Sequence, residues 1–303
     1  MSLTGIDFDH TGFDIISESL IARVSSPNSY RRPEGMSEAE FCDSLIQELE
    51  DTIQELGPEN VAAFIAEPVM GAGGVIVPPE GYHKRTSEVC KRYGVIYISD
   101  EVVTAFGRLG HMFASQDVFD FTPDIITCAK GLTSAYAPLS ATILSDEFYD
   151  VISVPQAEGA IFAHGFTYSG HPVCCAAGLK NIEILERENI CGHIREVGPY
   201  FEKQLGTLRD LPIVGDVRGS HFMMCVENVA NKQSKELIDP AAKVGNRIAD
   251  ACQRRGVLVR PIAHLNVLSP PLVLTRDQID TLVSVLRESI EEVVEDLTRD
   301  GLL

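Results

Sequence analysis

The stretch "VIYISDEVVTAFGR" (residues 95–108) begins as an apolar run typical of a buried β-strand and then carries two acids, the first of which is Asp100. A second apolar run, "DIITCAKG" (residues 124–131), carries Lys130 near its end. In a third run, "FIAEPV", Glu67 ends the predicted strand. In parallel sheets, ligands bind outside the carboxyl ends of the strands. We predict Asp100, Lys130 and Glu67 each to be the last residue of a strand, so the sequence predicts a site where the three meet at one sheet edge.

The surrounding sequence alternates between short apolar runs and amphipathic helical patterns. Ser37 and Glu40 form a predicted capping box ahead of a helix that ends near Gly57. Apolar runs at 61–67 and 95–100 then flank a second helical pattern. Nearly continuous apolar strands separated by helices indicate a mostly parallel sheet with helices on both faces, which is an α/β fold.

After about residue 188 the pattern changes. A helix is followed by two strand-like runs, a helix, a further strand and a long amphipathic helix at the C-terminus. This order is typical of an α+β unit rather than a continuation of the parallel sheet. We therefore predict a larger domain over residues 1–188 and a smaller C-terminal α+β domain over residues 189–303.

The composition argues against several classes of partner. The chain has 44 Asp and Glu against 25 Lys and Arg, a net charge of −19, which repels nucleic acids and anionic membranes. No apolar run approaches the ~18 residues of a membrane span, and the N-terminus does not resemble a secretory signal. The eight cysteines, like the His and acidic residues, show no metal-ligand spacing. Because scattered free cysteines suit a reducing compartment, we expect a soluble cytoplasmic protein without a metal.

A carboxylate and an amine at one sheet edge suit a particular chemistry. A lysine amine can form a Schiff base with an aldehyde, and a pyridine-ring aldehyde cofactor needs a carboxylate to keep its ring nitrogen protonated. Lys130 and Asp100 would supply these two groups. For any one of these charges alone, the simpler explanation is a strand-end side chain that reaches water.

Four motifs, in order, resemble those of the class III (ω-amino) aminotransferases, which are pyridoxal phosphate enzymes of fold type I. They are "AEPVMGAGGVIVPPEGY", "ISDEVVTAFGRLG", "PDIITCAKGLTSAYAPLSA" and "HGFTYSGHPVCCAAGL". The resemblance implies the PLP-transferase fold, with a large α/β domain and a smaller C-terminal domain. It also implies pyridoxal 5'-phosphate as cofactor and a homodimer with the active sites at the subunit interface.

The resemblance also assigns roles to individual residues. Lys130 matches the lysine that forms the internal aldimine and later moves the substrate Cα proton, and Asp100 matches the carboxylate that pairs with the ring nitrogen. Val102 matches the aliphatic residue packed on the ring, and Thr167 the residue that reaches the cofactor phosphate of the neighbouring subunit. Glu67 belongs to the same cofactor site. An ordinary core valine and a turn threonine are the simpler explanations for Val102 and Thr167.

Two positions distinguish substrate types within the resemblance. Ornithine- and γ-aminobutyrate-type members carry an acid and an arginine where this chain has Ala72 and Val267. Arg260 instead resembles the arginine that binds carboxylates in ω-amine:pyruvate aminotransferases, a role that suits the planar guanidinium. The alternative is a surface arginine at a strand end. The implied reaction moves an amino group from an ω-amino acid or amine to a keto acid such as pyruvate. A related aminomutase or decarboxylase would use the same lysine and aspartate.

Family members carry a long segment ahead of the region that this chain matches, with a Gly-Ser phosphate loop and an aromatic-His pair. The run "SLTGIDFDH" resembles the sequence just after that pair. The chain thus resembles the C-terminal two-thirds of such an enzyme, with a large domain incomplete at its N-terminus. A second hypothesis follows, namely a non-catalytic fragment or remnant of an aminotransferase.

Overall fold

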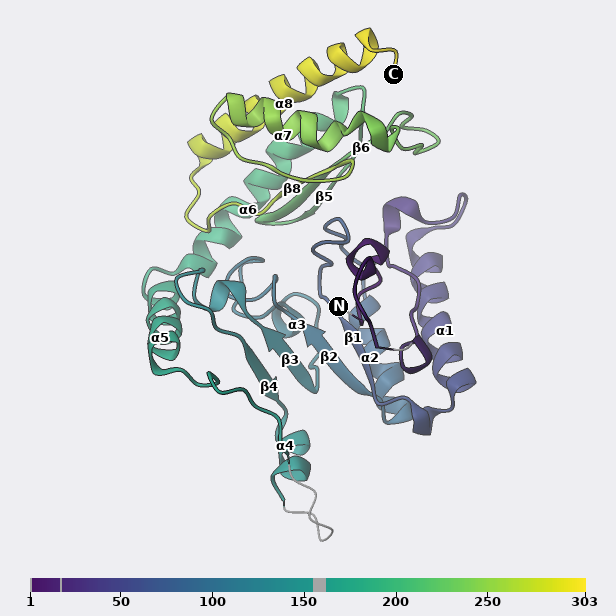
Figure 1. Cartoon of the computed structure of the whole chain (residues 1–303), viewed down its shortest axis with the longest axis vertical. Helices are drawn as coiled ribbons and strands as arrows, with labels where there is room; N and C mark the ends of the chain where they lie inside the picture. Colours follow the sequence, from purple (N-terminus) through teal and green to yellow (C-terminus); the bar gives the residue numbers. More distant parts are fainter. Residues whose placement is uncertain (1, 17, 155–161) are drawn as a thin grey trace.

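The computed structural model describes residues 2–16, 18–154 and 162–303, which build two β-sheets with helices around them (Figure 1). The helices of this described part are α1 (Glu38–Leu56), α2 (Tyr82–Tyr93), α3 (Ala114–Asp117), α4 (Asp146–Ser153), α5 (Pro172–Arg187), α6 (Ile190–Gly206), α7 (Val244–Arg254) and α8 (Arg276–Arg299). The strands are β1 (Ala63–Ala66), β2 (Ile96–Asp100), β3 (Ile125–Cys128), β4 (Ala141–Leu144), β5 (Val214–Ser220), β6 (Met223–Asn228), β7 (Arg260–Ile262) and β8 (Leu265–Leu268).

The first sheet has the order β1-β2-β3-β4, with β1, β2 and β3 parallel and β4 antiparallel. The predicted, mostly parallel sheet is therefore confirmed. The helix ahead of it also begins and ends as expected. Ser37 and Glu40 form both hydrogen bonds of a capping box at the start of α1, and Gly57 ends the helix with a φ of 81°.

Helices α1 and α2 cover one face of the first sheet. On that face Tyr97 is almost fully buried and packs edge-on against Phe64 and Phe121. On the opposite face the cover is incomplete within the described residues, since Ile65 is 36% exposed and Ile98 is half-buried. Because side chains alternate along a strand, apolar residues here occupy both faces while helices pack on one.

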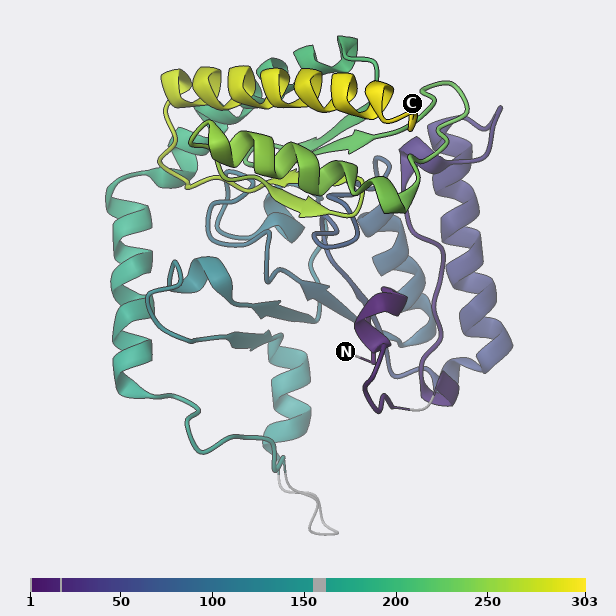
Figure 2. The same ribbon diagram turned by 45° about the horizontal axis from the view of Figure 1, so that its top comes forward.

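The second sheet is antiparallel, with the order β5-β6-β8-β7. Its outer face packs against α6, α7 and α8, and its inner face packs against loops that extend from the first sheet (Figure 2). Alternate residues of β6 make these two contacts, because Met224 and Val226 join the outer core whereas Met223 and Cys225 join the inner one. The second sheet therefore forms a wall beside the carboxyl ends of β1, β2 and β3.

The sequence patterns placed some elements of this second sheet inaccurately. Strand β8 was not predicted, because its short run lies between two prolines and a tight turn. Strand β7 begins only at Arg260, three residues after the apolar run starts. The division into domains at residue 188 remains a prediction, although the two sheets lie on either side of it. No helix in the described ranges is long and apolar enough to cross a membrane.

Candidate functional site

The three predicted strand-end charges gather at the carboxyl edge of the first sheet. Strand β2 ends at Asp100, as predicted. Ala66 pairs with Ser99, so Glu67 follows β1 directly beside Asp100. Lys130 was predicted as the last residue of its strand, and this is wrong by two residues. Strand β3 ends at Cys128, and Lys130 opens a short 3-10 turn, η5 (Lys130–Leu132).

The two adjacent acids at the end of β2 have different roles. Asp100 is half-buried, and its Oδ1 accepts a hydrogen bond from the Val102 N–H at 3.1 Å. Its other oxygen has no partner among the described residues. Glu101 is fully buried and accepts hydrogen bonds from the Ala114 N–H at 2.6 Å and the Ser115 N–H at 2.9 Å. Glu101 therefore fixes the loop that follows β2, and Asp100 keeps an oxygen free for a ligand.

Lys130 has an unusual backbone conformation. Its φ is +38°, in the left-handed region that residues with a Cβ rarely adopt. Such strain costs on the order of 1–3 kcal/mol and clusters at functional sites. The side chain is exposed, and its amine makes no hydrogen bond or ion pair within the described ranges. A free amine on a strained turn is available to a ligand that enters beside Asp100.

The pKa of Glu67 depends on the charges of both Asp100 and Lys130. Burial raises the pKa of Glu67 above its ordinary value, and the charge of Asp100 raises it further. A hydrogen bond from the Gly71 N–H to Oε2 at 2.8 Å and the positive charge of Lys130 act in the opposite direction. The three strand-end residues therefore form one electrostatic group.

The other predicted site residues lie in three different places. Val102 is half-buried next to Asp100. Thr167 is exposed on the long connection between α4 and α5 (Figure 1). Arg260 is exposed at the start of β7, the last strand in the order of the second sheet, directly opposite Val267. The structure thus brings Val102 to the strand-end residues, whereas Thr167 and Arg260 make no hydrogen bond or ion pair with them among the residues described.

His83 on α2 supports the site and was not predicted. It is buried, its Nε2 lies 2.9 Å from the carbonyl oxygen of Pro68, and its Nδ1 lies 2.9 Å from the Tyr97 hydroxyl. Burial lowers the pKa of His83 to about 4, so the ring is neutral near pH 7. The Nε2–H therefore donates to Pro68 and Nδ1 accepts from Tyr97. His83 holds the residue next to Glu67, and nothing in its helical sequence context signals this.

Arg108 joins the loop after Asp100 to the second sheet. Its Nη1 donates to the carbonyl oxygens of Phe222 at 2.9 Å and Pro270 at 2.6 Å. Burial lowers the pKa of Arg108 to about 10, which still leaves it charged near neutral pH. In the described part of the chain, no group of three His, Cys, Asp or Glu is placed to hold a metal ion.

Comparison with known proteins identifies relatives over nearly the whole chain. The profile of the family "Aminotransferase class-III" matches residues 10–290. The uncharacterized aminotransferase y4uB of Sinorhizobium fredii is 43% identical over 99% of this chain and 65% of its own length. The mitochondrial gamma-aminobutyrate transaminase 1 of Oryza sativa subsp. indica is 40% identical over 97% of this chain and 57% of its own length.

Solved structures of transaminases also match nearly the whole chain. The omega transaminase from Pseudomonas jessenii in complex with PMP superposes with a TM-score of 0.92, at 36% identity, over 98% of this chain and 65% of that one. The chain therefore spans between 57% and 65% of the length of these relatives. The matched range, residues 10–290, spans both sheets.

Proposed function

Because the chain belongs to the class III aminotransferases, we propose that it carries out amino-group transfer from an ω-amino acid or amine to a keto acid such as pyruvate. One observation above all supports this activity. A carboxylate with a free oxygen and an amine without a partner share the carboxyl edge of a parallel sheet, as Asp100 and Lys130 do. Aminomutase and decarboxylase reactions use the same pair and remain related alternatives.

Pyridoxal 5'-phosphate is the cofactor of this family, and the donor groups at the site fit the ring end of that molecule. When bound, it supplies an electron sink for the bonds around the substrate's amine-bearing carbon. Asp100 would bind the ring nitrogen through the oxygen that Val102 leaves free. Lys130 would bind the aldehyde carbon, and Val102 would pack against the ring.

The protein side chains then have separate tasks. Lys130 Nζ would move the proton to and from the amine-bearing carbon of the substrate. Asp100 would hold the protonated ring nitrogen of the cofactor in one orientation, because the hydrogen bond from the Val102 N–H fixes the Asp100 carboxylate. Glu101 would keep that loop rigid through its hydrogen bonds to Ala114 and Ser115. Glu67, whose pKa is raised, would place a carboxyl group beside Lys130 at the edge of the site.

We propose that Arg260 binds the carboxylate of the acceptor. Its guanidinium is exposed and unpaired in the described residues, which suits a two-point grip on a mobile carboxylate. The register supports the assignment, because Arg260 lies directly opposite Val267, where other substrate types carry their arginine. Arg260 is therefore the arginine next to that position in this chain, and Ala72 provides no acid to pair with it. Gamma-aminobutyrate, the substrate named for one relative, belongs in any donor panel.

We propose that two copies of the chain form a homodimer through the segment that contains Thr167. Phe162, Phe166 and Tyr168 are 62%, 75% and 80% exposed on this segment, an unusual density of uncovered aromatic rings. If a partner subunit covered these rings, Thr167 would lie close to the cofactor phosphate bound by that partner. Sedimentation velocity should show a dimer at micromolar concentration. A monomer at every concentration would remove the basis for the role of Thr167.

The compartment remains a proposal as well. The eight cysteines, all within the described residues, are free thiols, and five of them are buried. This supports a reducing location such as the cytoplasm. Some relatives are named as mitochondrial proteins, so fractionation of the native host is the direct measurement.

The proposed function is tested by mixing the purified chain with pyridoxal phosphate and recording the visible spectrum. We expect a yellow absorbance band that disappears on adding an amine donor and returns on adding pyruvate. Donors should include a simple amine, an ω-amino acid and γ-aminobutyrate, with alanine formation measured for each. A chain that shows neither the band nor alanine formation would support the second hypothesis, a non-catalytic fragment.

A further inference from the structure

A tight turn over residues 71–75 begins four residues after Glu67 and is joined to it by a hydrogen bond. Met70 and Ile76 pair in antiparallel fashion on either side of the turn, and the N–H groups of Gly74 and Val75 both donate to the Gly71 carbonyl at 3.1 Å. The Gly71 N–H in turn donates to Glu67 Oε2 at 2.8 Å. Any displacement of this turn therefore moves the hydrogen bond that orients the Glu67 carboxylate.

The turn is strained and needs support from outside. Val75 has a φ of +52°, which is an outlier for a β-branched residue, and it is completely buried. Gly74 has a φ of +114° and could not carry a side chain without strain. Conformations of this kind persist only where the surroundings hold them in place.

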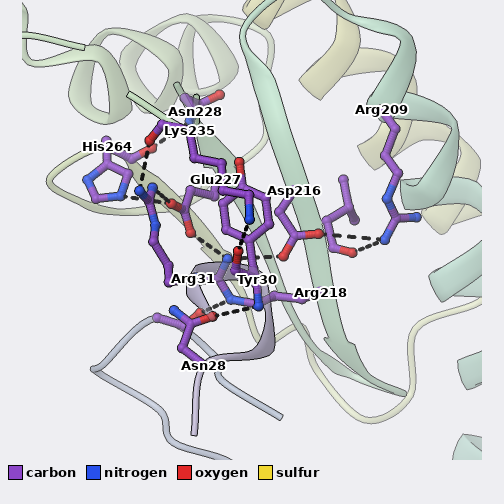
Figure 3. A network of polar contacts seen from close by, with 12 residues as sticks. Asn28, Tyr30, Arg31, Arg209, Asp216, Arg218, Glu227, Asn228, Lys235 and His264 are labelled. Carbon is purple, nitrogen blue, oxygen red and sulfur yellow. Dashed lines mark hydrogen bonds and ion pairs between the residues drawn. The ribbon is translucent and has the colours of Figure 1, made fainter. Parts of the chain in front are cut away.

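Arg218 on β5 lies against the turn. Its Nε donates to the Gly74 carbonyl at 2.8 Å. A Cβ placed on Gly74 would lie 2.9 Å from both Arg218 Nη2 and Leu265 Cδ1, so a side chain there would have to displace Arg218 and Leu265. Arg218 is itself held from behind, because its Nη1 donates to Glu227 Oε2 at 2.5 Å and to Asp216 Oδ2 at 3.3 Å (Figure 3).

Glu227 is the centre of the group that orients Arg218. Its side chain is only 2% exposed, and its other oxygen accepts a hydrogen bond from Arg31 and lies 3.5 Å from His264 Nε2 (Figure 3). Burial on its own raises the pKa of Glu227, but His264, Arg31 and Arg218 outweigh it and lower the pKa to about 2. The stabilisation from this charge is complete above pH 4.5, the ordinary value, and is lost as the pH falls through 2.

We propose that Arg218, oriented by Glu227, is a positioning residue that holds the turn at 71–75 and, through the Gly71 N–H, the carboxylate of Glu67. The consequence for substrate rests on the proposed function. The turn also carries Ala72, which is exposed. At this position the ornithine- and γ-aminobutyrate-type aminotransferases carry an acid. Arg218 and Glu227 on the second sheet would therefore fix the position of the turn beside the substrate site, without touching the substrate.

Hydrogen–deuterium exchange on the whole chain, without cofactor, tests the positioning role directly. In Arg218→Met we expect the Gly74 and Val75 amides to exchange about tenfold faster, since a charge-assisted hydrogen bond to the turn is lost. Amides in the middle of α8 should keep their wild-type rates. Arg209→Met is the matched control, because Arg209 donates to Val217 and lies 3.9 Å from Asp216 but has no contact with the turn. Faster exchange throughout the protein, or an unchanged turn, would overturn the proposal.

Glu227→Gln separates the two parts of the proposal. It leaves Arg218 in place but removes the charge that orients it, so the turn amides should exchange faster than in the wild type and slower than in Arg218→Met. Wild-type rates in this variant would exclude the role of Glu227.

With the loaded protein, Arg218→Met should raise the KM for the amine donor about tenfold and change kcat by less than about twofold. An equal loss in kcat would contradict a positioning role. Absence of turnover in every variant, wild type included, would count against the proposed function and leave the exchange result unaffected.

Discussion

Replacing Lys130 by alanine is expected to lower the rate of amino-group transfer by about 10²–10⁴-fold, the range that a positioned proton-transfer group contributes. Lys130 is the amine at the carboxyl edge of the first sheet, and its side chain has no hydrogen bond or ion pair in the described residues to lose. Alanine also has a Cβ, so the strain at φ +38° is unchanged and the fold should survive. Turnover with saturating cofactor is the measurement.

The same variant should also lose its covalent link to the cofactor. Borohydride treatment of the wild-type chain should fix pyridoxal phosphate on the peptide that contains Lys130, as mass spectrometry would show. Lys84→Ala is the matched control, because Lys84 is an exposed surface lysine paired with Asp120 at 2.7 Å. Label that persists in Lys130→Ala, or that disappears in Lys84→Ala, would contradict the assignment of Lys130.

The carboxyl edge could be predicted because it depends on local patterns. Each apolar run has its charged residue at the same end, and parallel strands place those ends together. The predicted strand end was right for Asp100 but one residue too late at Glu67 and two residues too late at Lys130. The strand pairing of β3 ends at Cys128, before the strained backbone at Lys130. The apolar pattern of a sequence does not show where a strand gives way to such a turn.

The supporting contacts could not be predicted, because they join distant parts of the chain. Gly74 and Arg218 are 144 positions apart, and Arg31 and Glu227 are 196 apart. An arginine in a strand and a glutamate in another strand give no sign in sequence that they face each other. Glu101 was equally hidden. Next to Asp100 it looks like a second site acid, whereas its burial makes it an anchor for the loop.

Asp100→Asn is expected to have the second-largest effect, a loss of about 10²–10³-fold in turnover, comparable to the removal of one charge-stabilising group from an enzyme site. The substitution keeps the shape of the side chain, and the asparagine Oδ1 still accepts from the Val102 N–H, so the loop should stay in place. What is lost is the negative charge that keeps a ring nitrogen protonated. The measurement is kcat at saturating donor, with cofactor affinity from a spectral titration.

Asp120→Asn serves as the control, since Asp120 is an exposed acid whose partner is the surface residue Lys84. It should leave both kcat and cofactor affinity at wild-type values. If Asp100 acts through its charge, Asp100→Asn should reduce kcat far more than cofactor affinity, because the aliphatic and covalent contacts at Val102 and Lys130 remain. A variant that binds and turns over like the wild type would show that the free oxygen of Asp100 faces water and holds no ligand, and the case for Lys130 would then have to stand without its partner.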